Sequence, residues 1–115
     1  MKVTVNVYYN PELSGLKIFE DLDTAGSYEF DIFLILEDAL GMLYYCSDSG
    51  CSCPTPFEDV TEVMEITKDT LYNFDKALEN HSGIGTSDYL RISKKVKDHL
   101  ARFTAVNNAK EFFYS

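Results

Sequence analysis

The chain has 115 residues, of which 45% are hydrophobic and 14% aromatic, and this excludes a disordered chain and predicts one globular unit. The net charge of −9 disfavours direct binding to nucleic acid, whose phosphates are also negative. The longest apolar run, Ile32 to Leu36, is far shorter than the roughly 20 residues that cross a bilayer. Without an export signal or a membrane segment, we expect a cytoplasmic protein whose three cysteines are thiols.

Strand patterns occupy the first part of the chain. Val3 to Val7 alternates apolar and polar residues, as in a half-buried strand. Turn residues follow, and a second, weaker strand is expected from Lys17 to Leu22. The segment from Asp23 to Ser27 is rich in small and polar residues, so we expect a loop there.

The strongest strand pattern runs from Tyr28 to Leu36. It begins with alternation and ends fully apolar, which predicts a central strand of the sheet. The polar segment Glu37 to Gly41 is typical of a hairpin loop, and Met42 to Cys46 would be the returning strand.

From Ser47 to Pro56 the sequence changes to Ser, Asp, Gly, Cys and Pro, and we expect no regular element. The following residues Thr55-Pro56-Phe57-Glu58 have a capping-box pattern with proline at the first helical position. This pattern predicts a short helical turn from Glu58 to Met64.

Two helices are expected after this turn. The first should be capped by Thr67 or Asp69 and end at residues 81–83. Its apolar face consists of Leu71, Phe74 and Leu78. Its end contains His81, and His99 lies on the second helix; both are expected as helix-terminal or half-buried residues rather than ligands.

The second helix should be capped near Ser87. Its apolar stripe consists of Tyr89, Ile92, Val96, Leu100 and Phe103. Its basic residues, on the other side, are Arg91, Lys94, Lys95, Lys97 and Arg102. The tail Phe112-Phe113-Tyr114 is expected to dock on the protein, with a partner surface as the alternative.

Strands first and helices last predict the α+β class. We expect one domain over residues 1–115, with an antiparallel sheet of three to four strands in the N-terminal half. Two C-terminal helices would cover this sheet.

The segment Asp48-Ser49-Gly50-Cys51-Ser52-Cys53-Pro54-Thr55-Pro56-Phe57-Glu58-Asp59 is the most unusual in the chain. It resembles an uncharacterised family of small proteins from phages of actinobacteria, a domain of unknown function marked by Asp-Ser-Gly-Cys-Ser-Cys-Pro-x-Pro-Phe-Glu-Asp. Tyr28-Glu29-Phe30-Asp31 and Asp38-Ala39-Leu40-Gly41 match two further segments of that family. The resemblance covers residues 26–59 and implies a phage-encoded protein in a bacterial cytoplasm, but no reaction.

Three interpretations of this loop compete. As a zinc site it would use Cys51 and Cys53 with Cys46 or Asp48, although Cys-x-Cys alone is a weak metal signal. As a catalytic site it would use Cys51 or Cys53 as nucleophile and Asp48, Glu58 or Asp59 as acid or base. The loop has no Lys, Arg or His that could lower a thiol pKa, so this chemistry is disfavoured.

We favour the third interpretation, a rigid structural loop whose small cysteines pack and whose prolines stiffen the chain. Such a loop is also a common place for recognition. Candidate partner-binding residues are Asp48, Ser49, Cys51, Cys53, Glu58 and Asp59.

The expected function is therefore that of a non-catalytic accessory protein, without a cofactor, that binds and modulates a host or phage protein. Thirteen of the nineteen acidic residues precede Thr67, so we expect a partner with a basic surface. A zinc-stabilised structural domain is the alternative, and a small enzyme ranks third.

Overall fold

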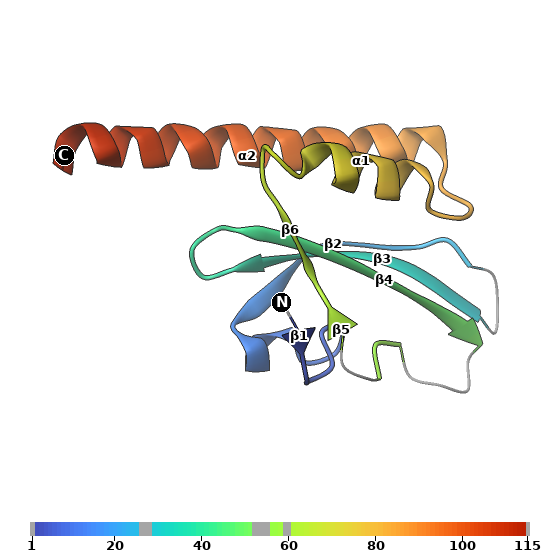
Figure 1. Ribbon diagram of the computed structural model, residues 1–115. Coiled ribbons are helices and arrows are strands. Elements are labelled where there is room, and N and C mark those ends of the chain that lie inside the picture. The colour runs from blue at the N-terminus through green and yellow to red at the C-terminus, as the bar shows by residue number, and fades with distance from the viewer. Residues whose placement is uncertain (1, 26–28, 52–55, 59–60, 115) are drawn as a thin grey trace. The chain divides into compact units, whose positions relative to one another are not determined.

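The computed structural model describes residues 2–25, 29–51, 56–58 and 61–114. The elements in chain order are β1 (Lys2–Val3), the 3₁₀ helix η1 (Pro11–Ser14), β2 (Leu16–Asp23), β3 (Glu29–Asp38), β4 (Leu43–Cys51), β5 (Thr61–Glu62), β6 (Met64–Ile66), α1 (Leu71–Glu79) and α2 (Thr86–Tyr114) (Figure 1). Two compact units make up the chain, residues 1–84 and residues 85–115. The strands precede the helices, so the predicted α+β class is confirmed.

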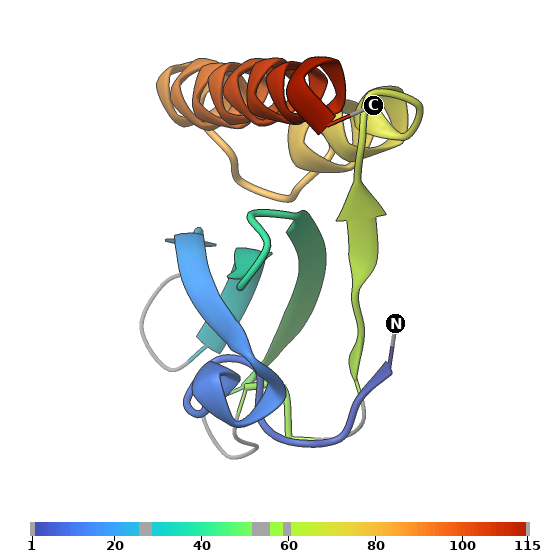
Figure 2. The same cartoon turned by 90° about the vertical axis from the view of Figure 1, so that its left-hand side faces the viewer.

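The main sheet is antiparallel and has the strand order β2-β3-β4-β6 (Figure 2). Its centre is β3, in which Leu34 lies opposite Asp21 of β2 and opposite Cys46 of β4. The predicted central position of this strand is confirmed. A second, two-stranded sheet joins β1 to β5, with Val3 opposite Thr61.

Both faces of β3 are covered, which explains its continuous apolar run. On one face, Ile32 and Leu34 belong to a buried cluster that includes Val7 from the N-terminal segment. On the other face, the ring of Phe33 lies 6.0 Å from that of Phe74 in α1. Within residues 1–84, α1 therefore packs on the sheet face opposite the N-terminal segment.

The hairpin between β3 and β4 is built around Asp38. Its Oδ1 accepts the backbone N–H groups of Leu40 at 2.9 Å and Met42 at 3.0 Å. Its Oδ2 accepts the hydroxyl of Tyr44 at 3.0 Å. Gly41 has a φ of 88°, a conformation that glycine adopts without a steric cost. The predicted hairpin is confirmed.

The predicted strand from Val3 to Val7 is wrong beyond Val3, because Asn6 closes a turn. The Asn6 Oδ1 atom accepts the N–H groups of Tyr8 and Tyr9, both at 2.9 Å. Asparagine side chains compete with strand ladders in this way. The alternating pattern still marks burial, since Val3 and Val7 are both in the core.

Two predictions for residues 47–64 are also wrong. Residues 47–51 continue β4 instead of forming an irregular loop, because they complete the ladder with the start of β3, where Glu29 lies opposite Cys51. The expected helical turn from Glu58 to Met64 is replaced by β5 and the start of β6. Pairing with β1 and β4 outweighs the local capping pattern there.

The first helix buries Phe74 and Leu78 as predicted, while Leu71 is half-buried. Its N-cap is Thr70 and not Thr67 or Asp69. The reason is a turn before the helix, in which the Thr70 Oγ1 atom accepts the backbone N–H of Thr67 at 2.8 Å.

The second helix begins at Thr86, next to the predicted cap at Ser87. Its predicted stripe is confirmed: Ile92, Val96 and Leu100 are buried, and Tyr89 and Phe103 are half-buried. The predicted basic residues are all exposed, namely Arg91, Lys94, Lys95, Lys97 and Arg102. The helix continues to Tyr114, and the side chains of Phe112-Phe113-Tyr114 lie outside the described part.

Candidate functional site

Asp48 is a half-buried residue of β4 whose carboxylate is bound to backbone groups. Its Oδ1 accepts the N–H of Ser49 at 2.9 Å, and its Oδ2 accepts the N–H of Phe57 at 2.8 Å. A carboxylate held in this way orders the chain around it and adds stability. The sequence suggested Asp48 as a metal ligand, an acid–base group or a partner contact. In the structure its carboxylate binds the backbone of Phe57, where the chain turns back to the hydrophobic core.

A turn at Pro56 and Phe57 brings the chain back to the hydrophobic core. Phe57 has a φ of 57°, in the left-handed region that bulky residues rarely adopt. Besides the bond from Asp48, the Asn6 Nδ2 group donates to the carbonyl oxygen of Pro56 at 2.8 Å. The Phe57 ring is 3% exposed and stacks on Tyr8 with ring centres 6.1 Å apart. Asp48, Asn6 and Tyr8 thus hold this unusual turn on the core.

The structure describes the side chains of only some of the other candidate partner-binding residues. The side chains of Ser49 and Glu58 are exposed. Cys51 is the last residue of β4, and its side chain is outside the described part of the chain, as are Cys53 and Asp59 altogether. Ser49 and Glu58 are therefore the members of the candidate set that are described and exposed.

Cys46 is a buried, free cysteine in the same hydrophobic cluster as Val7, Ile32 and Leu34, on one face of the main sheet. Burial raises the pKa of the Cys46 thiol to about 12, with a further contribution from the charge of Asp48. A metal ligand or a nucleophile must be a thiolate, which this environment disfavours. Cys46 and Cys51 are also five positions apart in one strand, about 17 Å, which is too far for two ligands of one zinc ion.

We expect melting temperatures with and without reductant to coincide, because Cys46 is a free thiol and three cysteines do not form a paired framework. Thermal unfolding followed by circular dichroism measures this. A fall of more than a few degrees under reductant would show that a disulfide stabilises the fold.

His81 follows the end of α1 and is half-buried, as the sequence suggested, and its side chain is only 6% exposed. Its Nε2 atom lies 3.0 Å from the carbonyl oxygen of Asp31 and 3.2 Å from Thr24 Oγ1. A carbonyl oxygen can only accept, so Nε2 carries the proton of this hydrogen bond. The ring also packs edge-on against Phe33, with ring centres 5.6 Å apart.

The contact between His81 and Asp31 joins the segment after α1 to the end of the sheet at which β3 begins. The Asp31 carboxylate lies 3.5 Å from the His81 Nε2 atom, and the Thr24 hydroxyl donates to the carbonyl of Ser82. Asp31 and His81 are 50 positions apart in the chain, which explains why local sequence patterns do not connect them. Because Nε2 donates to the backbone, the arrangement favours a structural histidine.

Beside this histidine, residues 1–84 contain a hollow of about 520 Å³. Its lining includes Phe33 and Tyr45, whose rings stack 5.8 Å apart, and Met64, which is 50% exposed. Its volume is in the range of small-ligand sites. It has room for an apolar side chain or a small ligand.

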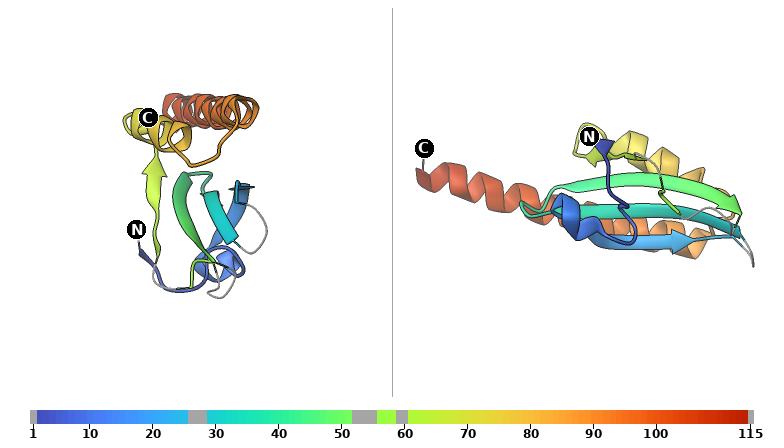
Figure 3. Two further views of the ribbon diagram at one scale, coloured as in Figure 1. Left: turned by 90° about the vertical axis from the view of Figure 1, so that its right-hand side faces the viewer. Right: turned by 90° about the horizontal axis from the view of Figure 1, so that it is seen from below.

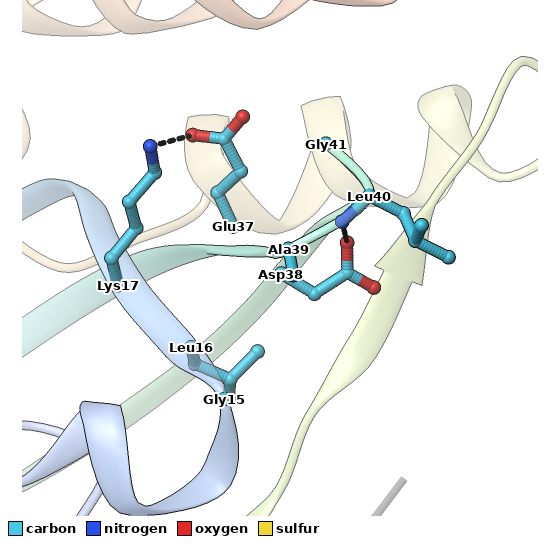
Figure 4. Close-up of a pocket in the computed structure, with 8 residues that line it drawn as sticks. All are labelled: Gly15, Leu16, Lys17, Glu37, Asp38, Ala39, Leu40 and Gly41. Atoms are coloured by element: carbon cyan, nitrogen blue, oxygen red, sulfur yellow. Dashed lines mark hydrogen bonds and ion pairs between the residues drawn. The ribbon is translucent and has the colours of Figure 1, made fainter.

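A second hollow, of about 420 Å³, lies at the hairpin end of the sheet (Figure 4). The Lys17 Nζ atom pairs with Glu37 Oε1 at 3.4 Å, and Asp38 is bonded to the Leu40 amide. Leu40 is 79% exposed. The charged groups along this hollow are already paired with each other or with the backbone.

The opposite end of β2 and the start of β3 carry exposed carboxylates. Asp21, Asp23 and Glu29 are all exposed. Before Thr67 the sequence has only two basic residues, Lys2 and Lys17, and Lys17 pairs with Glu37. This end of the sheet is therefore an acidic surface.

In the part of the chain that the structure describes, no group of three or more His, Cys, Asp or Glu is placed to hold a metal ion. Likewise, none of the described helices is long and apolar enough to span a bilayer.

A family model described as "Domain of unknown function (DUF7574)" matches residues 5–109. No curated protein and no solved structure matches the chain.

Proposed function

The chain belongs to the family of the domain of unknown function DUF7574, and we propose that it is a small phage accessory protein without catalytic activity. It binds a host or phage protein through a basic surface of that partner and modulates it. The site of action is the bacterial cytoplasm, as the resemblance to actinobacteriophage proteins implies.

The observation that carries this proposal is the acidic surface of Asp21, Asp23 and Glu29. All three carboxylates are exposed. A concentrated negative field attracts a basic protein and speeds its encounter, and it repels nucleic acid. The same field weakens with salt because exposed charges are screened.

The reactive groups support a binding role over catalysis. The Cys46 thiol is buried and its pKa is raised. The Asp48 carboxylate accepts two backbone amides, and the His81 Nε2 group donates to the backbone. The Asp48 carboxylate and the His81 ring therefore hold the fold, and burial disfavours the reactive thiolate form of Cys46.

Affinity capture from an actinobacterial lysate tests this function. We expect the intact protein to retain one host protein at a fixed ratio and to release it as salt is raised. The triple variant Asp21→Asn, Asp23→Asn, Glu29→Gln should capture markedly less, because it removes three negative charges from the acidic surface. The changes are mild: the asparagine at position 23 keeps the oxygen that accepts the amides of Ala25 and Asp31.

The matched control neutralises three other exposed carboxylates, those of Glu12, Glu65 and Asp69. It should capture as much as the natural protein, and both variants should melt within a few degrees of it. Equal losses in the two triple variants, or capture that salt does not weaken, would contradict the proposed role of the acidic surface.

A further inference from the structure

The backbone of β2 presents hydrogen-bonding groups to the outside of the sheet. In an antiparallel ladder, successive residues alternately point their N–H and C=O groups toward and away from the partner strand. Just beyond β2, the N–H of Thr24 donates to the carbonyl of Asp31 at 3.1 Å, so Thr24 points toward β3. By alternation, the backbone groups of Asp23 and Asp21 point away from β3.

This side of β2 is the edge of the sheet. The strand order β2-β3-β4-β6 places β2 at one end, and Figures 2 and 3 show it along the outer margin of the strands. A register shift between Ile18 and Glu20 interrupts the regular ladder. The regular stretch of the edge is therefore Glu20 to Asp23, and its outward backbone groups belong to Asp21 and Asp23.

We propose that an extended, basic segment of a partner protein adds to this edge as a further strand. The inference rests on the proposed function and specifies how the partner binds. Backbone groups of the added strand would pair with those of Asp21 and Asp23, as in other complexes formed by strand addition.

The side chains specify the pattern of the added segment. Asp21 and Asp23 stand on one face of the sheet, opposite Leu34 and Ile32 of β3, whereas Leu22 stands on the other face. One oxygen of each carboxylate already accepts a hydrogen bond within the chain, Asp23 Oδ1 from the amides of Ala25 and Asp31 and Asp21 Oδ2 from the Tyr8 hydroxyl, and both residues remain exposed. Opposite charges on directly facing strand residues stabilise a pair. The segment should therefore carry two basic residues separated by one residue, and an apolar residue between them on the Leu22 side.

The same charges disfavour a second copy of this chain as the occupant. Antiparallel pairing of two β2 strands centred on Leu22 would bring Asp21 of each chain opposite Asp23 of the other. Facing carboxylates destabilise a strand pair, and charged edges prevent self-association in this way. A basic partner removes the repulsion.

A synthetic peptide tests the geometry. The probe is a fluorescein-labelled nine-residue peptide in which lysine and valine alternate, and binding to the whole protein is followed by fluorescence anisotropy. One control peptide has the same composition with its lysines and valines in separate blocks. A second control keeps the alternation but has N-methyl groups on alternate backbone amides, which removes the strand hydrogen bonds.

We expect the alternating peptide to bind, and both control peptides to bind about tenfold more weakly or not at all. The double variant Asp21→Asn, Asp23→Asn should weaken the alternating peptide about tenfold. A control that neutralises Glu12 and Glu65 should stay within about twofold.

A measurement on the natural protein avoids any effect of substitution on folding. Hydrogen exchange at the amides of Asp21 and Asp23 should slow when the alternating peptide is bound. Unchanged exchange, or equal affinity for the N-methylated peptide, would overturn strand addition while lysate capture could still support the proposed function. Failure of the alternating peptide to bind would also overturn strand addition, and loss of the captured protein from the lysate assay would overturn the function itself.

Discussion

Replacing Phe57 by alanine should lower the free energy of unfolding by about 3–5 kcal/mol. The ring is 3% exposed, stacks on Tyr8 and belongs to the cluster beneath the sheet. Its loss leaves a cavity in that cluster. It also removes the apolar contact that offsets the left-handed backbone at residue 57, where an alanine is still strained. Urea unfolding of the two proteins measures the difference.

The neighbouring residue supplies a matched control. Glu58 is exposed, so Glu58→Ala should change the free energy of unfolding by less than about 0.5 kcal/mol. Removing the acceptor of the Phe57 amide, with Asp48→Ala, should cost about 1–3 kcal/mol. If Glu58→Ala is the more damaging change, the Phe57 ring is not what holds the turn at Pro56 and Phe57 on the core.

Strands β3 and β4 show how much of the fold the sequence predicts. The apolar run of β3 predicts a central strand, because only burial on both faces tolerates such a run. The continuation of β4 through residues 47–51 is not predictable from Ser, Asp and Gly, which have low strand propensity. It comes from pairing with the start of β3, a contact between distant residues.

The candidate site is likewise only partly predictable from the sequence. Composition alone marks the cysteine segment as unusual and favours the structural interpretation of its loop. The role of Asp48 depends on knowing that the chain returns at Phe57, nine residues later. His81 and Asp31 are 50 residues apart, and nothing in the local pattern of either residue indicates their contact.

In α2, Leu100→Ala should lower the free energy of unfolding by about 2–5 kcal/mol. Leu100 is 8% exposed and lies on the buried stripe with Ile92 and Val96. Alanine is the better helix former by a few tenths of a kcal/mol, so a net loss of this size can only come from lost burial. Thermal or urea unfolding of the whole protein provides the measurement.

Lys97→Ala is the matched control on the same helix, because its side chain is exposed while Leu100 is buried. It should change stability by less than about 0.5 kcal/mol, and Lys94→Ala should behave alike. Both lysine variants keep the helix propensity high, so the comparison isolates burial from helix formation. A larger loss for the lysine variants than for Leu100→Ala would mean that the basic face of α2, and not the stripe of Ile92, Val96 and Leu100, is its stabilising face.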